Sequence, residues 1–178
     1  MLAEAILTFW FNQLSPAQWW KKDAEVDQLI TQQFSIVHHQ ATSGELFGWR
    51  ATARGCLAEV IILDQFSRNM FRGTPQSFAY DGMALSLAQE AIRRSLDQEL
   101  SLSERSFLYM PFMHSESLAI HQQALNLFLA PGLEQTLDFE KQHLEIIKRF
   151  GRYPHRNAIL NRTSTDEEKE FLKQHAGF

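Results

Sequence analysis

Helix start and stop signals recur along the whole chain, and they constrain its fold more than any other feature of the sequence. Ser15-Pro16 is typical of a helix start, because serine caps free N–H groups and proline suits the first helical turn. Asp23 offers the same capping chemistry ahead of apolar residues with a period near 3.6, and Gly44 ends that run. The segment 165–168 (TDEE) has the form of a capping box before a last helix. The chain is therefore predicted to be helical from end to end.

The remaining helices are predicted from the same kinds of signal. They cover residues 52–71, a segment starting at Asp81, a segment ended or kinked by Pro111, residues 116–129, and a segment stopped by Gly151. Short breaks between helices of this length imply antiparallel neighbours. We predict an all-α fold, a compact single domain over residues 1–178 built as a stack of antiparallel helical hairpins.

Composition and cysteine usage indicate a soluble cytoplasmic protein. The hydrophobic share of 44% is enough for a well-packed core without disulfides. Cys56 is the single cysteine, so an internal disulfide is excluded and a reducing compartment is favoured. Glu4 stands where a signal peptide carries positive charge, and no apolar run approaches the ~18 residues of a membrane span. The net charge of −4 argues against general binding of nucleic acid.

Positive charge is concentrated in residues 148–162, which contain five lysine or arginine residues and no acid. Four of the five are arginines, among them Arg149, Arg152 and Arg156, and arginine suits directional, bidentate recognition of carboxylate or phosphate. An acidic chain has no solubility reason to gather positive charge in one place. The segment therefore predicts contact either with an anionic ligand or with carboxylates elsewhere in the fold.

The predicted helix over residues 52–71 has an apolar stripe that becomes ionic toward its C-terminal end. Asp64, Arg68 and Arg72 lie on this stripe, and Gln65 and Asn69 lie one step around the helix. Asp64 precedes Arg68 by four residues, a spacing that permits an ion pair. Charged groups on such a face either pair in the interior or line a ligand site, and the sequence leaves both open.

Two further groups carry candidate chemistry. His143 lies on an apolar helix face, where a lone histidine is more often a core residue than a reactive one. His114 follows Pro111 at the junction of two predicted helices, beside N–H groups that are suited to an anion. Ser115 is expected to cap the second of these helices, and the dipole favours Glu116 in its first turn.

Three of these segments resemble the signature blocks of a bacterial family. The blocks are residues 63–72 (LDQFSRNMFR), 109–117 (YMPFMHSES) and 149–157 (RFGRYPHRN). The chain thus resembles the domain of unknown function 924 over nearly its whole length. Tyr153 replaces a phenylalanine expected in this family and Ser67 a proline, and neither change affects a charged position. The resemblance implies a compact, tetratricopeptide-like, all-helical fold in the cytoplasm, and it implies no established substrate, reaction or cofactor.

The first functional hypothesis is a cleft, binding or enzymatic, for a small carboxylate or phosphate. Candidate catalytic groups are His114 and His143 as proton carriers, with Asp64 or Glu116 orienting the imidazole. The predicted ligand-binding residues are Gln65, Arg68, Asn69, Arg72, Arg149, Arg152, His155, Arg156 and Asn157.

The second hypothesis is a tetratricopeptide-like module that binds a protein or peptide partner, with buried polar residues that are purely structural. Against it, no clean repeat is visible in the sequence. No metal site is predicted, because His114, Glu116 and His121 have no diagnostic ligand spacing, and no particular cofactor is indicated. His38 and His39 are expected at the surface.

Overall fold

The computed structural model of the chain describes residues 2–174, and all regular structure in that range is helical. This confirms the predicted all-α fold class. The chain forms two compact units. Unit 1 comprises Met1–Arg72 and Gln76–Pro111, and unit 2 comprises Gly73–Pro75 and Phe112–Phe178.

Unit 1 contains most of the helices, and its central element is a long helix in three parts. The elements are α1 (Ala3–Thr8), η1 (Phe9–Gln13), α2 (Pro16–Trp20), α3 (Ala24–Thr42), η2 (Phe47–Ala51), α4 (Ala53–Ile61), η3 (Ile62–Phe66), α5 (Ser67–Met70), α6 (Asp81–Arg93), η5 (Leu96–Glu99) and most of η4 (Pro75–Phe78) and α7 (Leu102–Met113). The parts α4, η3 and α5 follow one another without a break, as predicted for residues 52–71. The middle part is wound as a π-helix, a local widening that shifts the register of the residues after it.

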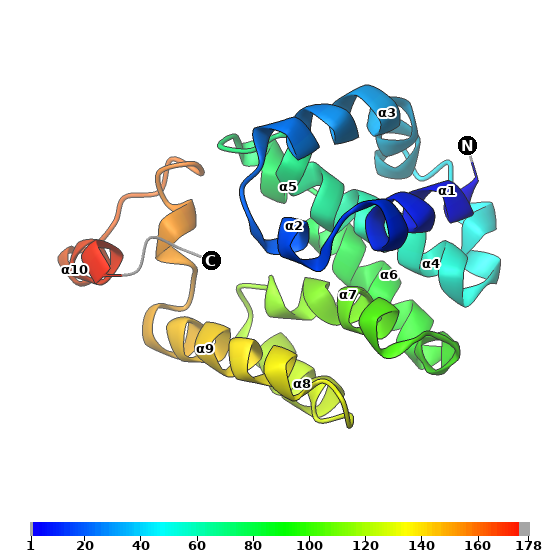
Figure 1. The fold of residues 1–178 in the computed structure, drawn as a ribbon. Coiled ribbons are helices and arrows are strands. Elements are labelled where there is room, and N and C mark those ends of the chain that lie inside the picture. Colours follow the sequence, from blue (N-terminus) through cyan, green and yellow to red (C-terminus); the bar gives the residue numbers. More distant parts are fainter. Residues whose placement is uncertain (1, 175–178) are drawn as a thin grey trace. The chain divides into compact units, whose positions relative to one another are not determined.

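The central helix is buried because other helices cover its faces. Helices α1 and α6 pack against α4, and α3 packs against η3 and α5 (Figure 1). Phe66 lies in an aromatic core, with ring-centroid distances of 5.0 Å to Phe34 and 5.8 Å to Trp10. Aromatic pairs at such separations add to the burial of apolar area. Asp64 is on the same buried element, so its carboxylate lies in the protein interior.

A close backbone contact sets the start of the central helix. The Thr52 side chain caps it by accepting a hydrogen bond from the Gly55 N–H at 3.1 Å. A Cβ atom at Gly55 would lie 1.9 Å from the backbone oxygen of Trp49. Only glycine therefore allows η2 to approach the first turn of α4 this closely.

Unit 2 contains one helical hairpin and a C-terminal segment. Helices α8 (Leu118–Phe128) and α9 (Glu134–Phe150) lie side by side as an antiparallel pair (Figure 1). They are followed by the short helix η6 (Pro154–Arg156) and by α10 (Asp166–Gln174), which contacts η6. Gly151 ends α9 with φ of 67°, a left-handed conformation that suits glycine, as its place in the sequence predicted.

One helix boundary differs from the sequence prediction. Pro111 lies inside α7, which continues to Met113. The proline gives up one backbone hydrogen bond, but Phe112 and Met113 are buried, and their burial stabilises the final turn. Helix α8 consequently begins later than expected, with Ser117 at its N-cap position. Among residues 2–174 no helix combines the length and apolar character that crossing a bilayer requires.

Candidate functional site

In unit 1, the predicted site residues Asp64, Gln65 and Arg68 belong to one ionic group. Arg68 Nη1 donates to Asp64 Oδ1 at 3.0 Å, which is the ion pair that their spacing permits. Its guanidinium also forms two bonds of 2.9 Å to the carboxylate of Asp81, the first residue of α6. The Gln65 amide donates to Asp64 Oδ2 at 2.6 Å. This group joins the central helix to α6.

The other two predicted residues of unit 1 bind a different acid. Arg72 donates to both carboxylate oxygens of Asp27, with distances of 2.6 and 2.7 Å. Asn69 Nδ2 donates to Asp27 Oδ1 at 2.7 Å. Asp27 lies on α3, so this second group joins the end of the central helix to α3.

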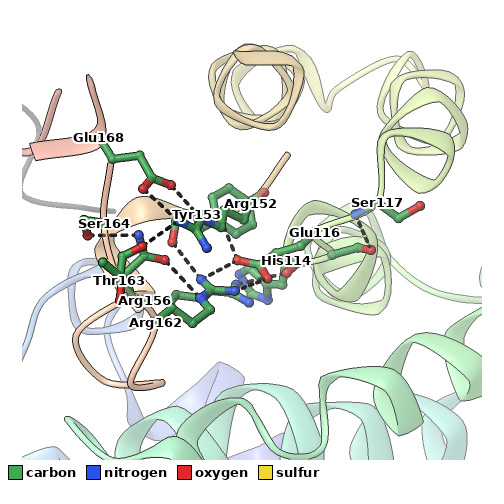
Figure 2. Close-up of polar contacts among 12 residues, drawn as sticks. His114, Glu116, Ser117, Arg152, Tyr153, Arg156, Arg162, Thr163, Ser164 and Glu168 are labelled. Carbon is green, nitrogen blue, oxygen red and sulfur yellow. Dashed lines mark hydrogen bonds and ion pairs between the residues drawn. The ribbon is translucent and has the colours of Figure 1, made fainter. Parts of the chain in front are cut away.

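In unit 2, several predicted residues lie around Tyr153 (Figure 2). The Tyr153 side chain is fully buried. The Tyr153 hydroxyl donates to the Met113 carbonyl oxygen at 2.5 Å and lies 3.1 Å from Nε2 of His121. We call Tyr153 and its neighbours the Tyr153 cluster. Its members are His114, Glu116, His121, His143, Tyr153, His155, Arg156 and Arg162.

Three imidazoles and one guanidinium lie around the Tyr153 ring. Ring-centroid distances from Tyr153 are 5.5 Å to His155, 5.7 Å to His143 and 6.3 Å to His121. The Arg156 guanidinium carbon lies 4.6 Å from the centroid, within the range of a cation–π interaction. Arg156 also donates from Nη2 to the His114 carbonyl oxygen at 2.9 Å (Figure 2). Residues from three separate stretches of the sequence therefore meet at one side chain.

The Glu116 carboxylate pairs with Arg162 and does not lie in the first turn of a helix. It accepts bonds of 2.6 and 2.9 Å from Arg162 and one of 2.7 Å from the Tyr153 N–H (Figure 2). Burial acts to raise the pKa of Glu116, but these hydrogen bonds and the charges of Arg156 and Arg162 outweigh it and lower the pKa. The expected place of Glu116 in the first helical turn is wrong, since α8 begins two residues later. Ser115 likewise does not cap α8; its hydroxyl accepts from the Ser117 N–H.

His143 is a buried, neutral imidazole. Its Nδ1 lies 2.8 Å from the Phe139 carbonyl oxygen, so Nδ1 carries the proton and Nε2 is an acceptor. Burial is the main cause that lowers the pKa of His143, to about 3, and it outweighs the effect of the bond to Phe139. His143 is therefore uncharged at neutral pH, with Nε2 as a hydrogen-bond acceptor.

The remaining predicted residues are held by α10 and the loop before it. Arg149 is half-exposed and donates to Glu167 at 2.7 Å. Arg152 forms bonds of 2.7 and 2.8 Å to the two carboxylate oxygens of Glu168 (Figure 2). The bond from Arg152 is the largest cause that lowers the pKa of Glu168, to about 2. Asn157 is buried and donates to the Ser164 hydroxyl at 3.0 Å.

Sequence reasoning missed some of the buried polar residues. His38 is buried on α3, and its Nε2 lies 2.8 Å from the Ser67 hydroxyl, so the expected surface position is wrong. The pattern held a signal, because His38 lies four residues after the buried Phe34. The sequence prediction includes His121 only among possible metal ligands and does not include Glu140. Among residues 2–174 there is no group of three or more His, Cys, Asp or Glu side chains placed to hold a metal ion.

Comparison with known proteins identifies a family and a similar solved structure, both of unknown function. The sequence profile of a bacterial protein family of unknown function, DUF924, matches residues 6–176. A solved structure of a protein of unknown function from Agrobacterium tumefaciens is 42% identical and has a TM-score of 0.92. The match covers 97% of this chain and 97% of that one. No curated protein matches the chain.

Proposed function

We propose that this chain, which belongs to the bacterial protein family of unknown function DUF924, binds a small carboxylate or phosphate at the Tyr153 cluster. The observation that carries the proposal is the meeting of His143, His155 and Arg156 at the Tyr153 ring. Nitrogen donors and acceptors of this kind, brought together from distant segments, are typical of sites that recognise oxyanions.

The proposed site includes fewer arginines than the sequence predicted. Arg68, Arg72, Arg149 and Arg152 each donate to a carboxylate of the chain itself. A ligand would have to compete with an acid that is tethered in place, which has a high effective concentration. We base the site on the histidines and Arg156 because they meet at one side chain, the Tyr153 ring.

Arg156 and His143 have complementary roles in this proposal. Arg156 supplies a permanent positive charge for the ligand's oxyanion. His143 is neutral, and its Nε2 is an acceptor, so it suits a ligand that also carries a hydroxyl group. Singly protonated phosphate and hydroxy acids have both features. The proposal is for binding of such an anion, with His143 as a hydrogen-bond acceptor.

The test is calorimetric titration of the protein with inorganic phosphate and, separately, with succinate and its hydroxy analogue malate. We expect saturable binding of at least one probe, weakened at least tenfold by Arg156→Gln. Arg149→Gln is the matched control, because it removes the same charge from an arginine bound to Glu167 in unit 2. It should leave binding unchanged.

Circular dichroism of each variant separates loss of binding from loss of fold. If Arg156→Gln unfolds, His155→Asn replaces it, since His155 is partly exposed and contacts the same ring. Absence of saturable binding for all three probes, or equal weakening by the Arg149 control, contradicts the proposal. That outcome would favour the alternative hypothesis, in which the polar residues are purely structural, as arginines paired with the chain's own carboxylates would be.

A further inference from the structure

A buried histidine–carboxylate pair joins the two helices of the unit 2 hairpin. Nδ1 of His121 on α8 lies 2.6 Å from Oε1 of Glu140 on α9, and both side chains have no exposed surface. A charged pair at such a depth carries a desolvation penalty that its attraction must offset. The position of the proton in this pair therefore matters for the stability of the hairpin.

The partners of the other ring nitrogen determine how many protons the pair holds. Nε2 of His121 lies 2.8 Å from the Ser115 carbonyl oxygen, which can only accept, so Nε2 carries a proton. The Tyr153 hydroxyl, 3.1 Å from the same nitrogen, uses its own proton for the Met113 carbonyl. One further proton then lies between Nδ1 and Oε1. It belongs either to an imidazolium beside a carboxylate or to a neutral imidazole beside a carboxylic acid.

The second carboxyl oxygen distinguishes these two states. Glu140 Oε2 is buried, and no donor among residues 2–174 forms a hydrogen bond with it. A carboxylate places half its charge on that oxygen, whereas in the acid form it is a neutral carbonyl oxygen with a much smaller desolvation penalty. Burial also raises the pKa of Glu140, against the effect of the bond to His121.

We infer that Glu140 is a neutral carboxylic acid in the folded protein and that its Oε1–H donates to Nδ1 of a neutral His121. This bond fixes the His121 tautomer whose Nε2–H donates to the Ser115 carbonyl oxygen. The chain of bonds ends at the carbonyl oxygens of Met113 and Ser115, which cannot pass a proton on. Glu140 is therefore a positioning residue, and the pair is not a proton relay. It places the segment that carries His114 and Glu116. This inference stands whether or not the Tyr153 cluster binds an anion.

The direct test is nitrogen-15 NMR of histidine-labelled protein near pH 7, without ligand. The inference expects a neutral imidazole at His121, protonated at Nε2 and unprotonated at Nδ1, a signature that His121→Gln would identify by its loss. An imidazolium spectrum, with both nitrogens protonated, overturns it. The protonation state is read from the wild-type chain, and His121→Gln serves only to assign the signal.

Two substitutions at position 140 give a second readout. Glu140→Gln keeps a neutral donor to Nδ1 and an oxygen acceptor, so we expect the urea midpoint and the His121 spectrum to stay at wild-type values. Glu140→Ala leaves Nδ1 without its donor and should lower the midpoint and change the tautomer mixture. Glu145→Gln, an exposed position on the same helix, is the control for loss of a carboxyl group. If Glu140→Gln lowers the midpoint as much as Glu140→Ala, Glu140 is ionised and the inference fails.

Discussion

The Glu116 carboxylate and the Arg162 guanidinium form a two-bond ion pair across 46 residues of sequence. The same arginine donates to the Asn157 side-chain oxygen at 2.9 Å and to the Tyr153 carbonyl oxygen at 3.1 Å. Arg162 thus ties the segment before α8 to the loop that follows α9. This pair is one of the connections that hold the Tyr153 cluster together, beside the bonds from Tyr153 to Met113 and from Arg156 to His114.

We expect Arg162→Gln to lower the free energy of unfolding by about 2 kcal/mol, because it leaves a half-buried carboxylate without its main partner. The value is below that for a fully buried pair, since water reaches part of both side chains. Urea unfolding of the two single variants and the double variant with Glu116→Gln measures the coupling. The exposed pair of Lys148 and Glu145 is the control, and Lys148→Gln should have no measurable effect. Additive single effects would show that the pair is not coupled.

In the ion pair of Arg50 and Glu59, removing one partner or the other should lower the free energy of unfolding by different amounts. Glu59 is fully buried and accepts bonds of 2.7 and 2.6 Å from Arg50, which is about one-third exposed. Arg50→Gln leaves a buried charge uncompensated and should cost about 3 kcal/mol, whereas Glu59→Gln leaves an arginine that water can solvate and should cost about 1 kcal/mol.

Chemical denaturation at neutral pH measures both values. Glu90→Gln is the control, because Glu90 forms its bonds with Arg93 on an exposed helix face and should not affect stability. Equal costs for the two substitutions, or a larger cost for Glu59→Gln, would contradict the argument.

His38 should make the protein less stable in mild acid. Burial lowers its pKa from 6.5 to about 4, with a further contribution from His39. Because the folded-state pKa is the lower one, the unfolded chain takes up the proton first. The stabilisation is therefore present above about pH 6.5 and is lost as the pH falls toward 4.

His38→Gln keeps a side-chain amide within reach of Ser67 but does not titrate. Unfolding free energies measured at several pH values should fall more steeply for the wild type in this window, by up to about 1.4 kcal/mol per pH unit. Parallel curves for the two proteins would show that His38 does not titrate as its burial implies.

The close approach at Gly55 predicts a steric effect. Gly55→Ala places a Cβ against the Trp49 carbonyl, a backbone group that cannot move independently of η2. We expect a loss of about 2–3 kcal/mol in the free energy of unfolding. Gly48→Ala is the matched control, since no atom lies within 4 Å of the added carbon. Thermal unfolding of both variants tests this prediction, and similar melting temperatures would contradict the expected clash at position 55.

Local signals predicted the helices well because they act over one turn. Asp23 accepts hydrogen bonds from the Glu25 and Val26 N–H groups at the start of α3, as its capping role requires. Thr165 and Glu168 exchange the two bonds of the predicted capping box. Pro111 is the exception, because the burial of neighbouring side chains outweighs its local effect. The single domain and the tetratricopeptide-like stacking stay predictions.

The sequence alone determined that the chain is helical and where most helices begin and end. It also determined that Asp64 and Arg68 can pair. Each of these features depends on residues no more than about four positions apart. Only the tertiary structure decided that Arg68 also binds Asp81, that Arg72 binds Asp27, and that Glu116 binds Arg162. It also decided that histidines from distant segments meet at Tyr153. The physical reason is that the partner of a charged side chain is set by which helices pack together, and that packing depends on the burial of the whole core.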